Sequence, residues 1–284
     1  MPARRDRSAG VPRLADAEAL AAALAPLVDA APDVLAVQEL DVLGDRSGRV
    51  HQPQVVADVL AAAGGPVDWR FAPTVLGIPG EAEPWQPVAG RLEDERWPED
   101  GRPRYGTALY VRRPVRRWSA LALRAGAASV PLPVTGPDGG TKLLVVRDEP
   151  RVAVAAETDG LTVVAAHLSF VPPVAVRQLR QVRAWAAGLP GPVLLVGDLN
   201  LPGALPGRVL GARRLVEGPT YPLPVPTRQL DHVLALRPLG DLRQELLLPW
   251  RLGRLDLELA VGDHRALCVD VEVPAPAVPG GAST

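Results

Sequence analysis

The sequence predicts an α/β (α+β) fold, a sandwich in which sheets carry most of the core and a few helices cover them. Short apolar runs recur between turn-forming Gly, Pro and Asp residues, which is typical of strands. Apolar residues at helical spacing are confined to a few segments. The chain has 284 residues, of which 47% are hydrophobic and 22% are charged, so it can bury a large core and is neither a disordered nor a membrane protein.

The first half of the chain predicts helices and strands in alternation. Residues 16–30 carry leucines at helical spacing and acids near the start, which predicts a helix. Residues 34–37 are a short apolar run after a proline and predict a buried strand, and residues 54–63 predict a second helix. Strand-like runs separated by turn residues follow at 105–111, 115–123, 143–146 and 152–156.

The second half continues the same pattern. Residues 161–166 predict a buried strand and residues 174–189 an amphipathic helix. Further strands are predicted at 193–196, 229–236 and 266–273. Residues 77–104 predict a long loop rich in Pro, Gly and acidic residues. This loop is either a flap over a binding site, with Trp85 and Trp97 as contacts, or an insertion that these tryptophans hold in place.

We expect one domain over residues 13–273, between a mobile N-terminal segment at 1–12 and a disordered tail at 274–284. The longest uncharged run near the N-terminus, residues 19–28, is too short for a membrane-spanning helix and has acidic flanks that do not suit a signal peptide. We therefore expect no transmembrane segment, a cytoplasmic location and a monomer.

The overall charge and the single cysteine exclude several kinds of protein. The chain has 31 Lys and Arg against 32 Asp and Glu, so no sequence-wide positive field exists to attract nucleic acid or anionic lipid. Cys268 is the only cysteine, which excludes a disulfide framework and a cysteine-based zinc site.

Acidic, amide and imidazole side chains gather where the predicted buried strands end or begin. Burial of charge costs free energy unless the charge is paired or bound to a metal, and strand ends are where rigid sites are built. Three of the four histidines belong to this set or adjoin it, which favours catalysis over packing. The candidate residues are Glu39, His167, Asp198, Asn200, Asp231, Asp263 and His264.

The donor types indicate the chemistry of this candidate site. Glu39, Asp198, Asn200 and Asp263 offer oxygen ligands and no sulfur, which suits a hard divalent cation such as Mg²⁺ or Mn²⁺. The sequence has no HExxH motif, Walker loop, GxGxxG or GxSxG, so zinc protease, nucleotide-binding and serine-hydrolase interpretations lose their main support. Metal-assisted hydrolysis remains, in which a His paired with an Asp takes a proton from water.

The motifs around these residues resemble, in order and separation, those of the endonuclease/exonuclease/phosphatase superfamily, the exonuclease III and DNase I-like metal-dependent phosphoesterases. The resemblance runs from about residue 33 to residue 273, and YGTALYVRRPV at 105–115 is similar to a central stretch of that family. The motifs are VQEL at 37–40, AAHLS at 165–169, VGDLN at 196–200, QLDHVL at 229–234 and GDHRAL at 262–267.

The resemblance implies a four-layer α-β-β-α sandwich of two mixed sheets, with a phosphoesterase site at one edge. It makes Glu39 the principal metal ligand and lets Asp263 contribute to the metal site directly or through water. It makes His264 the general base for the attacking water, oriented by Asp231.

The resemblance also implies roles at the phosphate. His167 donates a hydrogen bond to a phosphate oxygen. Asp198 and Asn200 hold the scissile phosphate, the nucleophile or a second metal, and these alternatives stay open.

We expect Gln38 to support Glu39 by hydrogen bonding. Of the remaining histidines, we expect His232 to be structural, because it points to the opposite side of its strand from Asp231, and His51 to be solvated in a polar turn.

The chain departs from the family pattern at its start. Family members begin with a strand that ends in a metal-site Asn, whereas Asn200 is the only Asn here and residues 1–32 contain no such strand. We expect a start codon assigned too far downstream, so that in-frame codons upstream encode the strand. The alternative is a catalytically impaired sandwich that binds phosphorylated ligands or a protein. Expected substrates are phosphate esters: nucleic acid, a phospholipid headgroup or a small phosphorylated molecule.

Overall fold

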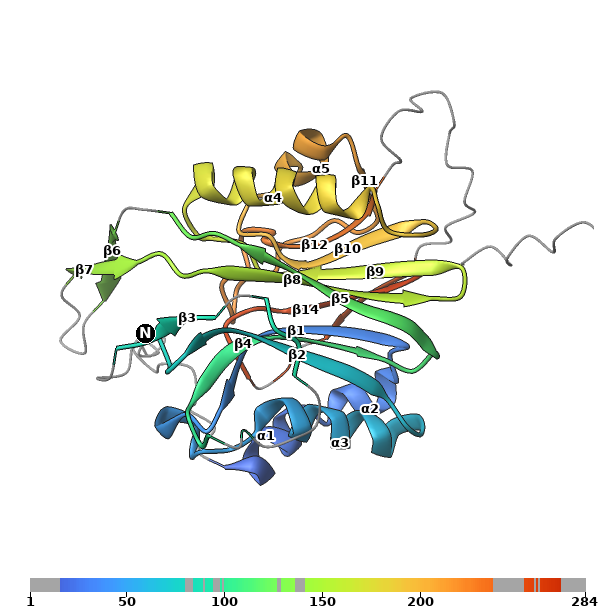
Figure 1. Cartoon of the computed structure of the whole chain (residues 1–284), viewed down its shortest axis with the longest axis horizontal. Coiled ribbons are helices and arrows are strands. Elements are labelled where there is room, and N and C mark those ends of the chain that lie inside the picture. The colour runs from blue at the N-terminus through green and yellow to red at the C-terminus, as the bar shows by residue number, and fades with distance from the viewer. Residues whose placement is uncertain are drawn as a thin grey trace, which may run out of the picture.

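The computed structural model describes residues 16–79, 84–88, 90–93, 98, 100–126, 129–135, 141–236, 253–257, 259 and 261–271. Two sheets pack face to face between two layers of helices (Figure 1). This arrangement confirms the predicted α/β sandwich of four layers. The terminal segments that we predict to be mobile, and Trp97, lie outside the described residues. No helix in the described part of the chain is long and apolar enough to cross a membrane.

The four-stranded sheet has the order β1-β4-β2-β3, and its described pairs are antiparallel. Its strands are β1 (Val34–Val42), β4 (Arg104–Val111), β2 (Asp68–Leu76) and β3 (Gln86–Pro87). Helices α1 (Ala17–Ala23), α2 (Pro26–Ala30) and α3 (Gln52–Gly64) cover its outer face (Figure 1). The side chains of Trp69, Phe71 and Tyr110 are almost fully buried in the core between these helices and the sheet.

The six-stranded sheet has the order β11-β12-β10-β9-β8-β5. Its strands are β11 (Arg213–Arg214), β12 (Asp231–Leu236), β10 (Val193–Asp198), β9 (Leu161–Ala166), β8 (Arg151–Thr158) and β5 (Val115–Leu123). Helices α4 (Pro172–Ala186) and α5 (Leu205–Leu210) lie on its outer face (Figure 1). On the inner face, Leu109 and Val111 of the first sheet share a core with Val152 and Val154 of the second.

Two hairpins and one short helix complete the described elements. The hairpins are β6 (Ser129–Thr135) with β7 (Thr141–Arg147) and β13 (Gly253–Leu257) with β14 (Ala266–Asp270), and the 3₁₀ helix is η1 (Asp45–Ser47). Among the described strands, β1 pairs only with β4, and β14 pairs only with β13. The described residues from Asp16 to Asp33 form helices α1 and α2 and supply no further strand beside β1.

Several element boundaries differ from the sequence predictions for local reasons. The helix predicted over residues 16–30 is divided, because Pro26 cannot continue α1 and instead begins α2. Strand β2 was not predicted, and Pro73 within it obscures the strand pattern. Trp85, in the predicted long loop, packs near the buried Val75 and Tyr105 with Arg147 over its ring at 4.6 Å. This contact fits the interpretation in which the tryptophan holds the segment in place.

Close approach of β9 and β10 requires a glycine at position 197. Gly197 has φ 122°, and a Cβ there would lie 2.3 Å from the carbonyl oxygen of Ala166 and 3.1 Å from the side-chain nitrogen of Gln38. Backbone at such a φ is strained for any residue with a side chain.

Gly197→Ala should therefore lower the free energy of unfolding by about 2–4 kcal/mol, measured by urea denaturation. Gly203→Ala is the matched control, since its φ is also positive, at 56°, but a Cβ there meets nothing within 4 Å. We expect the control to cost only about 1 kcal/mol. Equal losses in the two variants would contradict the close-approach explanation.

Candidate active site

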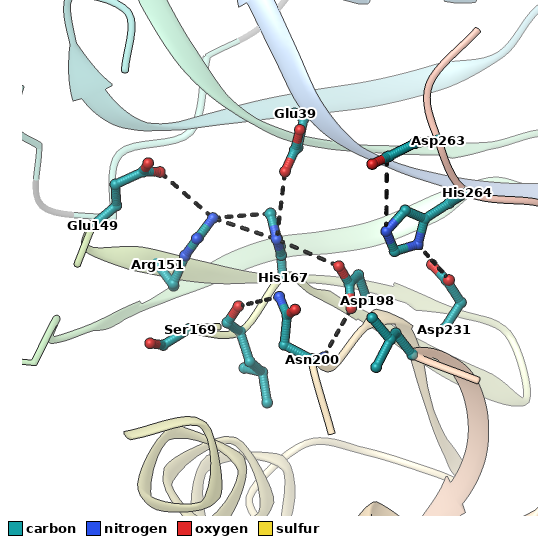
Figure 2. A network of polar contacts seen from close by, with 12 residues as sticks. Glu39, Glu149, Arg151, His167, Ser169, Asp198, Asn200, Asp231, Asp263 and His264 are labelled. Carbon is teal, nitrogen blue, oxygen red and sulfur yellow. Dashed lines mark hydrogen bonds and ion pairs between the residues drawn. The ribbon is translucent and has the colours of Figure 1, made fainter. Parts of the chain in front are cut away.

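The order of the strands brings the predicted polar groups to one edge of the six-stranded sheet. β9 and β10 run parallel, so the residues that follow them, beginning with His167 after β9, lie at the same edge as Asp198 at the end of β10. β12 runs antiparallel to β10, with Asp231 directly opposite Asp198. Chain direction alone therefore gathers three of the predicted site residues, which Figure 2 shows within one polar network.

Glu39 reaches this network from the other sheet. The register of β1 shifts between Val37 and Leu40, and Glu39 within this bulge has φ 60°. The bulge directs the carboxylate toward His167, with 3.9 Å between Glu39 Oε1 and His167 Nε2 (Figure 2). The Glu39 side chain is 64% exposed, so its carboxylate remains accessible to a ligand. A non-glycine residue at positive φ is uncommon, and here this conformation is part of the bulge that turns the carboxylate out of the sheet.

Hydrogen bonds fix the loops that follow β9 and β10 to each other. The backbone N–H of Leu168 donates to the carbonyl oxygen of Asp198 at 3.0 Å. The side chain of Asn200 donates to the carbonyl oxygen of Leu168 at 2.9 Å, and its backbone N–H donates to Asp198 Oδ1 at 2.8 Å. Asn200 therefore holds the two loops in position as well as lying in the site.

His264 and Asp231 form a close pair. His264 Nδ1 lies 2.7 Å from Asp231 Oδ2, and the ring of Tyr221 packs on His264 with 4.9 Å between centroids. Burial alone lowers the pKa of His264, but the hydrogen bond and charge of Asp231 outweigh it and raise the pKa to about 9. Asp263 Oδ1 lies 3.9 Å from the other ring nitrogen, and its side chain is 51% exposed.

His167 is a buried and neutral imidazole. Burial, and then the positive charge of Arg151, hold its pKa well below the usual value. Its Nε2 lies 3.6 Å from Asp198 Oδ2. Burial and the neighbouring Asp231 raise the pKa of Asp198, although His264 opposes them. The site thus combines a neutral imidazole with a charged one.

The structure brings all seven predicted residues into the network of Figure 2, and it corrects or refines other expectations. His51 is not solvated: it is 5% exposed, packs edge-on against Trp69 and accepts a hydrogen bond from the backbone N–H of Gln54 at the start of α3. His232 is buried with its Nε2 2.9 Å from the Leu201 carbonyl oxygen, as a structural residue would be. The side-chain nitrogen of Gln38 is buried and hydrogen-bonds no group in the described part of the chain.

Sequence reasoning missed three residues that contact the site. Arg151 touches His167, Glu149 pairs with Arg151, and Tyr221 packs on His264. Arg151 begins β8 and Glu149 lies just before it. Charged residues at a strand start normally indicate a solvated turn, so sequence alone gives no reason to place them in the site. Tyr221 lies in a proline-rich segment without periodicity, so its only signal was its aromatic character.

The donor atoms of the site are of the type that binds a hard cation, but the described residues do not form a complete set of metal ligands. Glu39 and Asp263 both present accessible carboxylates at the site, and no cysteine lies among the residues drawn in Figure 2. No group of three or more His, Cys, Asp or Glu in the described ranges is arranged so that it could hold a metal ion. Any such ligand set would therefore require additional donors or a rearrangement of these side chains.

Comparison with known proteins identifies the class. The profile of the Endonuclease/Exonuclease/phosphatase family matches residues 6–275, and the chain belongs to this family. Members of this family are phosphoesterases. A comparison with curated proteins finds no match.

Solved structures show the same fold at low sequence identity. A family protein from Leptotrichia buccalis C-1013-b has a TM-score of 0.54 and 11% identity, with 89% of this chain and 92% of that chain covered. A functionally unknown conserved protein from Enterococcus faecalis V583 has a TM-score of 0.54 and 13% identity, covering 90% and 91%. A mannosyl-6-phosphatase from Bacteroides thetaiotaomicron VPI-5482 has a TM-score of 0.50 and 12% identity, also covering 90% and 91%.

The His264–Asp231 pair should make stability depend on pH. The pKa of His264 rises from the ordinary 6.5 to about 9 on folding, so the protonated ring stabilises the fold fully below pH 6.5. This stabilisation is lost as the pH rises from about 6.5 to about 9. Because the His264 side chain is 28% exposed, we expect a loss on the order of 1–3 kcal/mol.

Urea denaturation with a chelator present, at pH about 6 and about 9.5, measures this loss. Asp231→Asn is the control, because it removes the charge that raises the pKa of His264 while preserving the size of the side chain. Asp231→Asn also removes a charge that raises the pKa of Asp198, whereas a second variant, His264→Gln, removes one that lowers it. A smaller pH dependence in both variants than in the wild type therefore assigns the loss to the pair. An equal pH dependence in the wild type and either variant would contradict the assignment.

Proposed function

We propose that this protein is a phosphoesterase that cleaves phosphodiester or phosphomonoester bonds with a divalent cation, Mg²⁺ or Mn²⁺, by attack of water activated at His264. The observation that carries the proposal is the 2.7 Å pair of His264 and Asp231, because Asp231 lies opposite Asp198 in the paired strands and Asp198 lies 3.6 Å from His167. A base oriented by a carboxylate, facing a neutral hydrogen-bond donor, is the arrangement that hydrolysis of a phosphate ester needs.

His264 acts as the general base after it has lost its own proton. Beside Asp231 its pKa is about 9, so the ring is protonated near pH 7. A cation held by Glu39 and Asp263 would lower this pKa, because positive charge nearby disfavours the imidazolium. Asp231 binds Nδ1, which orients the ring and leaves Nε2 to take a proton from the attacking water. As the imidazolium forms, the Asp231 carboxylate stabilises it. Tyr221 limits movement of the ring from one side.

His167 donates a hydrogen bond to a phosphate oxygen. Its neutral ring is almost fully buried, so the donor is fixed before the substrate arrives and stabilises the negative charge that develops there. Asp198 and Asn200 position the scissile phosphate, the nucleophile or a second cation. The backbone N–H of Asn200 donates to Asp198 and its side chain donates to the Leu168 carbonyl oxygen, which gives both residues a fixed geometry.

Glu39 and Asp263 would hold the cation, with Glu39 as the principal ligand. Such an ion supplies positive charge to the phosphate oxygens during attack. A phosphate ester is the proposed substrate, and the near-zero net charge favours small or single-stranded substrates over a long duplex.

A second candidate is a catalytically impaired domain that binds phosphorylated ligands or a protein. It is favoured by one observation, the lack of a ready-made group of three metal ligands in the described residues. Binding of a cation without turnover of any substrate would support this candidate over the enzyme.

Hydrolysis of a generic aryl phosphodiester with Mg²⁺ or Mn²⁺ tests the enzyme. Chelation should abolish turnover, and His264→Ala should lower kcat by about 10²–10⁴-fold because the base is lost. Release of the aryl alcohol, followed by absorbance, measures the rate.

His51→Asn is the matched control for the loss of a histidine. His51 lies at the start of α3 and is not among the residues labelled in Figure 2, and Asn also accepts a hydrogen bond at a helix start. The lost ring contact with Trp69 should lower stability, but turnover should change little. Turnover that survives both chelation and His264→Ala would reject the proposed mechanism.

A further inference from the structure

Arg151 is a buried cation directed at the ring of His167. β8 and β9 are antiparallel with Ala153 opposite Ala166, which places the start of β8 beside the residue that follows β9. Arg151 is 6% exposed, so its guanidinium cannot exchange this contact for bulk water. Burial of this charge costs free energy unless a hydrogen-bonding or charged partner compensates it.

The guanidinium approaches the two ring nitrogens unequally. Its Nη1 lies 3.0 Å from His167 Nδ1 and 3.4 Å from Nε2 (Figure 2). A guanidinium has only donors, so it bonds the ring nitrogen that carries no proton. The shorter distance selects Nδ1 as this acceptor.

The groups around Nε2 favour the same tautomer. This nitrogen lies 3.6 Å from Asp198 Oδ2 and 3.9 Å from Glu39 Oε1, two oxygens that accept hydrogen bonds when ionised. A proton on Nε2 is favoured by both carboxylates, whereas a proton on Nδ1 would face the guanidinium. The carboxylates near Nε2 therefore support the tautomer that the shorter Arg151 contact selects at Nδ1, although the same Nη1 also lies 3.4 Å from Nε2.

Glu149 balances the charge of Arg151. Its Oε2 lies 3.6 Å from Arg151 Nη1, and both side chains are buried. Burial, partly offset by Arg151, raises the pKa of Glu149. The pair can be buried together at lower cost than either charge alone.

We propose that Arg151 is a positioning residue that fixes His167 as the tautomer with its proton on Nε2, so that His167 presents an N–H to the phosphate oxygen. The inference rests on the proposed function for the identity of that oxygen. Arg151 does not touch the substrate; it acts through the imidazole. Loss of Arg151 should leave a mixture of tautomers, in which a part of the molecules presents a lone pair where the donor is needed.

The tautomer can be read directly from the ¹⁵N shifts of the histidine rings in the metal-free protein, with the whole chain of 284 residues present. The chain has only four histidines, and His167→Gln identifies the His167 signals by their disappearance. We expect a protonated Nε2 and an unprotonated Nδ1 in the wild type. A proton on Nδ1 in the wild type overturns the proposal without any variant.

Glu149→Gln and the double variant Glu149→Gln with Arg151→Met form a matched pair. Neither contains an unpaired Glu149 charge, and they differ only in whether residue 151 can donate to the ring. We expect the wild-type ¹⁵N pattern in Glu149→Gln, whereas in the double variant the shifts of Nδ1 and Nε2 should move toward each other. An unchanged pattern in the double variant overturns the proposal, and the signals of His232 and His264 verify that the site is folded.

Turnover of the aryl phosphodiester separates this proposal from the proposed function. The double variant should have a kcat about 10- to 100-fold below that of Glu149→Gln. Mixed tautomers with an unchanged kcat would overturn the catalytic part of the inference while leaving the enzyme intact. A wild type that shows the Nε2 proton but hydrolyses nothing would instead count against the proposed function.

Discussion

The pairing of three strands is the constraint on which the site depends. β9 parallel to β10, and β10 antiparallel to β12, place His167, Asp198 and Asp231 at one edge although long stretches of sequence separate them. The backbone pairs set this proximity, and the buried aliphatic side chains of these strands hold it. Burial of these polar groups beside one another shifts the pKa values of His167, Asp198 and His264: burial is the largest single cause for each, and neighbouring charges add to it or, at His264, together outweigh it.

The site also joins the two sheets, and local backbone features make this possible. Glu39 belongs to β1 of the four-stranded sheet, and its bulge with φ 60° directs the carboxylate across to His167. Gly197 on the facing strand has no side chain that would collide with Gln38 or with the Ala166 carbonyl. A bulge on one sheet and a glycine on the other therefore allow the strand ends to approach each other.

Much of the fold, and most of the residues that gather at the candidate site, could be predicted because both depend on local pattern. Apolar runs locate buried strands, and polar residues at their ends, such as His167 and Asp198, are conspicuous against them. Arg151 could not be found in this way, since a charged residue at a strand start looks like surface until the neighbouring strand is known. His51 was mistaken for a solvated residue for a related reason: its partner Trp69 belongs to β2, a strand that Pro73 concealed.

The balance of charge in the site gives physical support to a role for a cation. Among the residues drawn in Figure 2, the carboxylates of Glu39, Glu149, Asp198, Asp231 and Asp263 outnumber the guanidinium of Arg151 and the imidazolium of His264. The raised pKa of Asp198 and of Glu149 arises first from burial, and the charge of Glu39 adds to it in both.

A phosphate ester is itself an anion, and such a site repels it unless positive charge enters with it. Arg151 does not provide that charge, because it is already engaged by Glu149 and His167. The excess of carboxylate is thus what a site would need if a hard divalent cation were part of substrate binding. Glu39 and Asp263 are the most exposed of these carboxylates, so they are the two that a cation could reach.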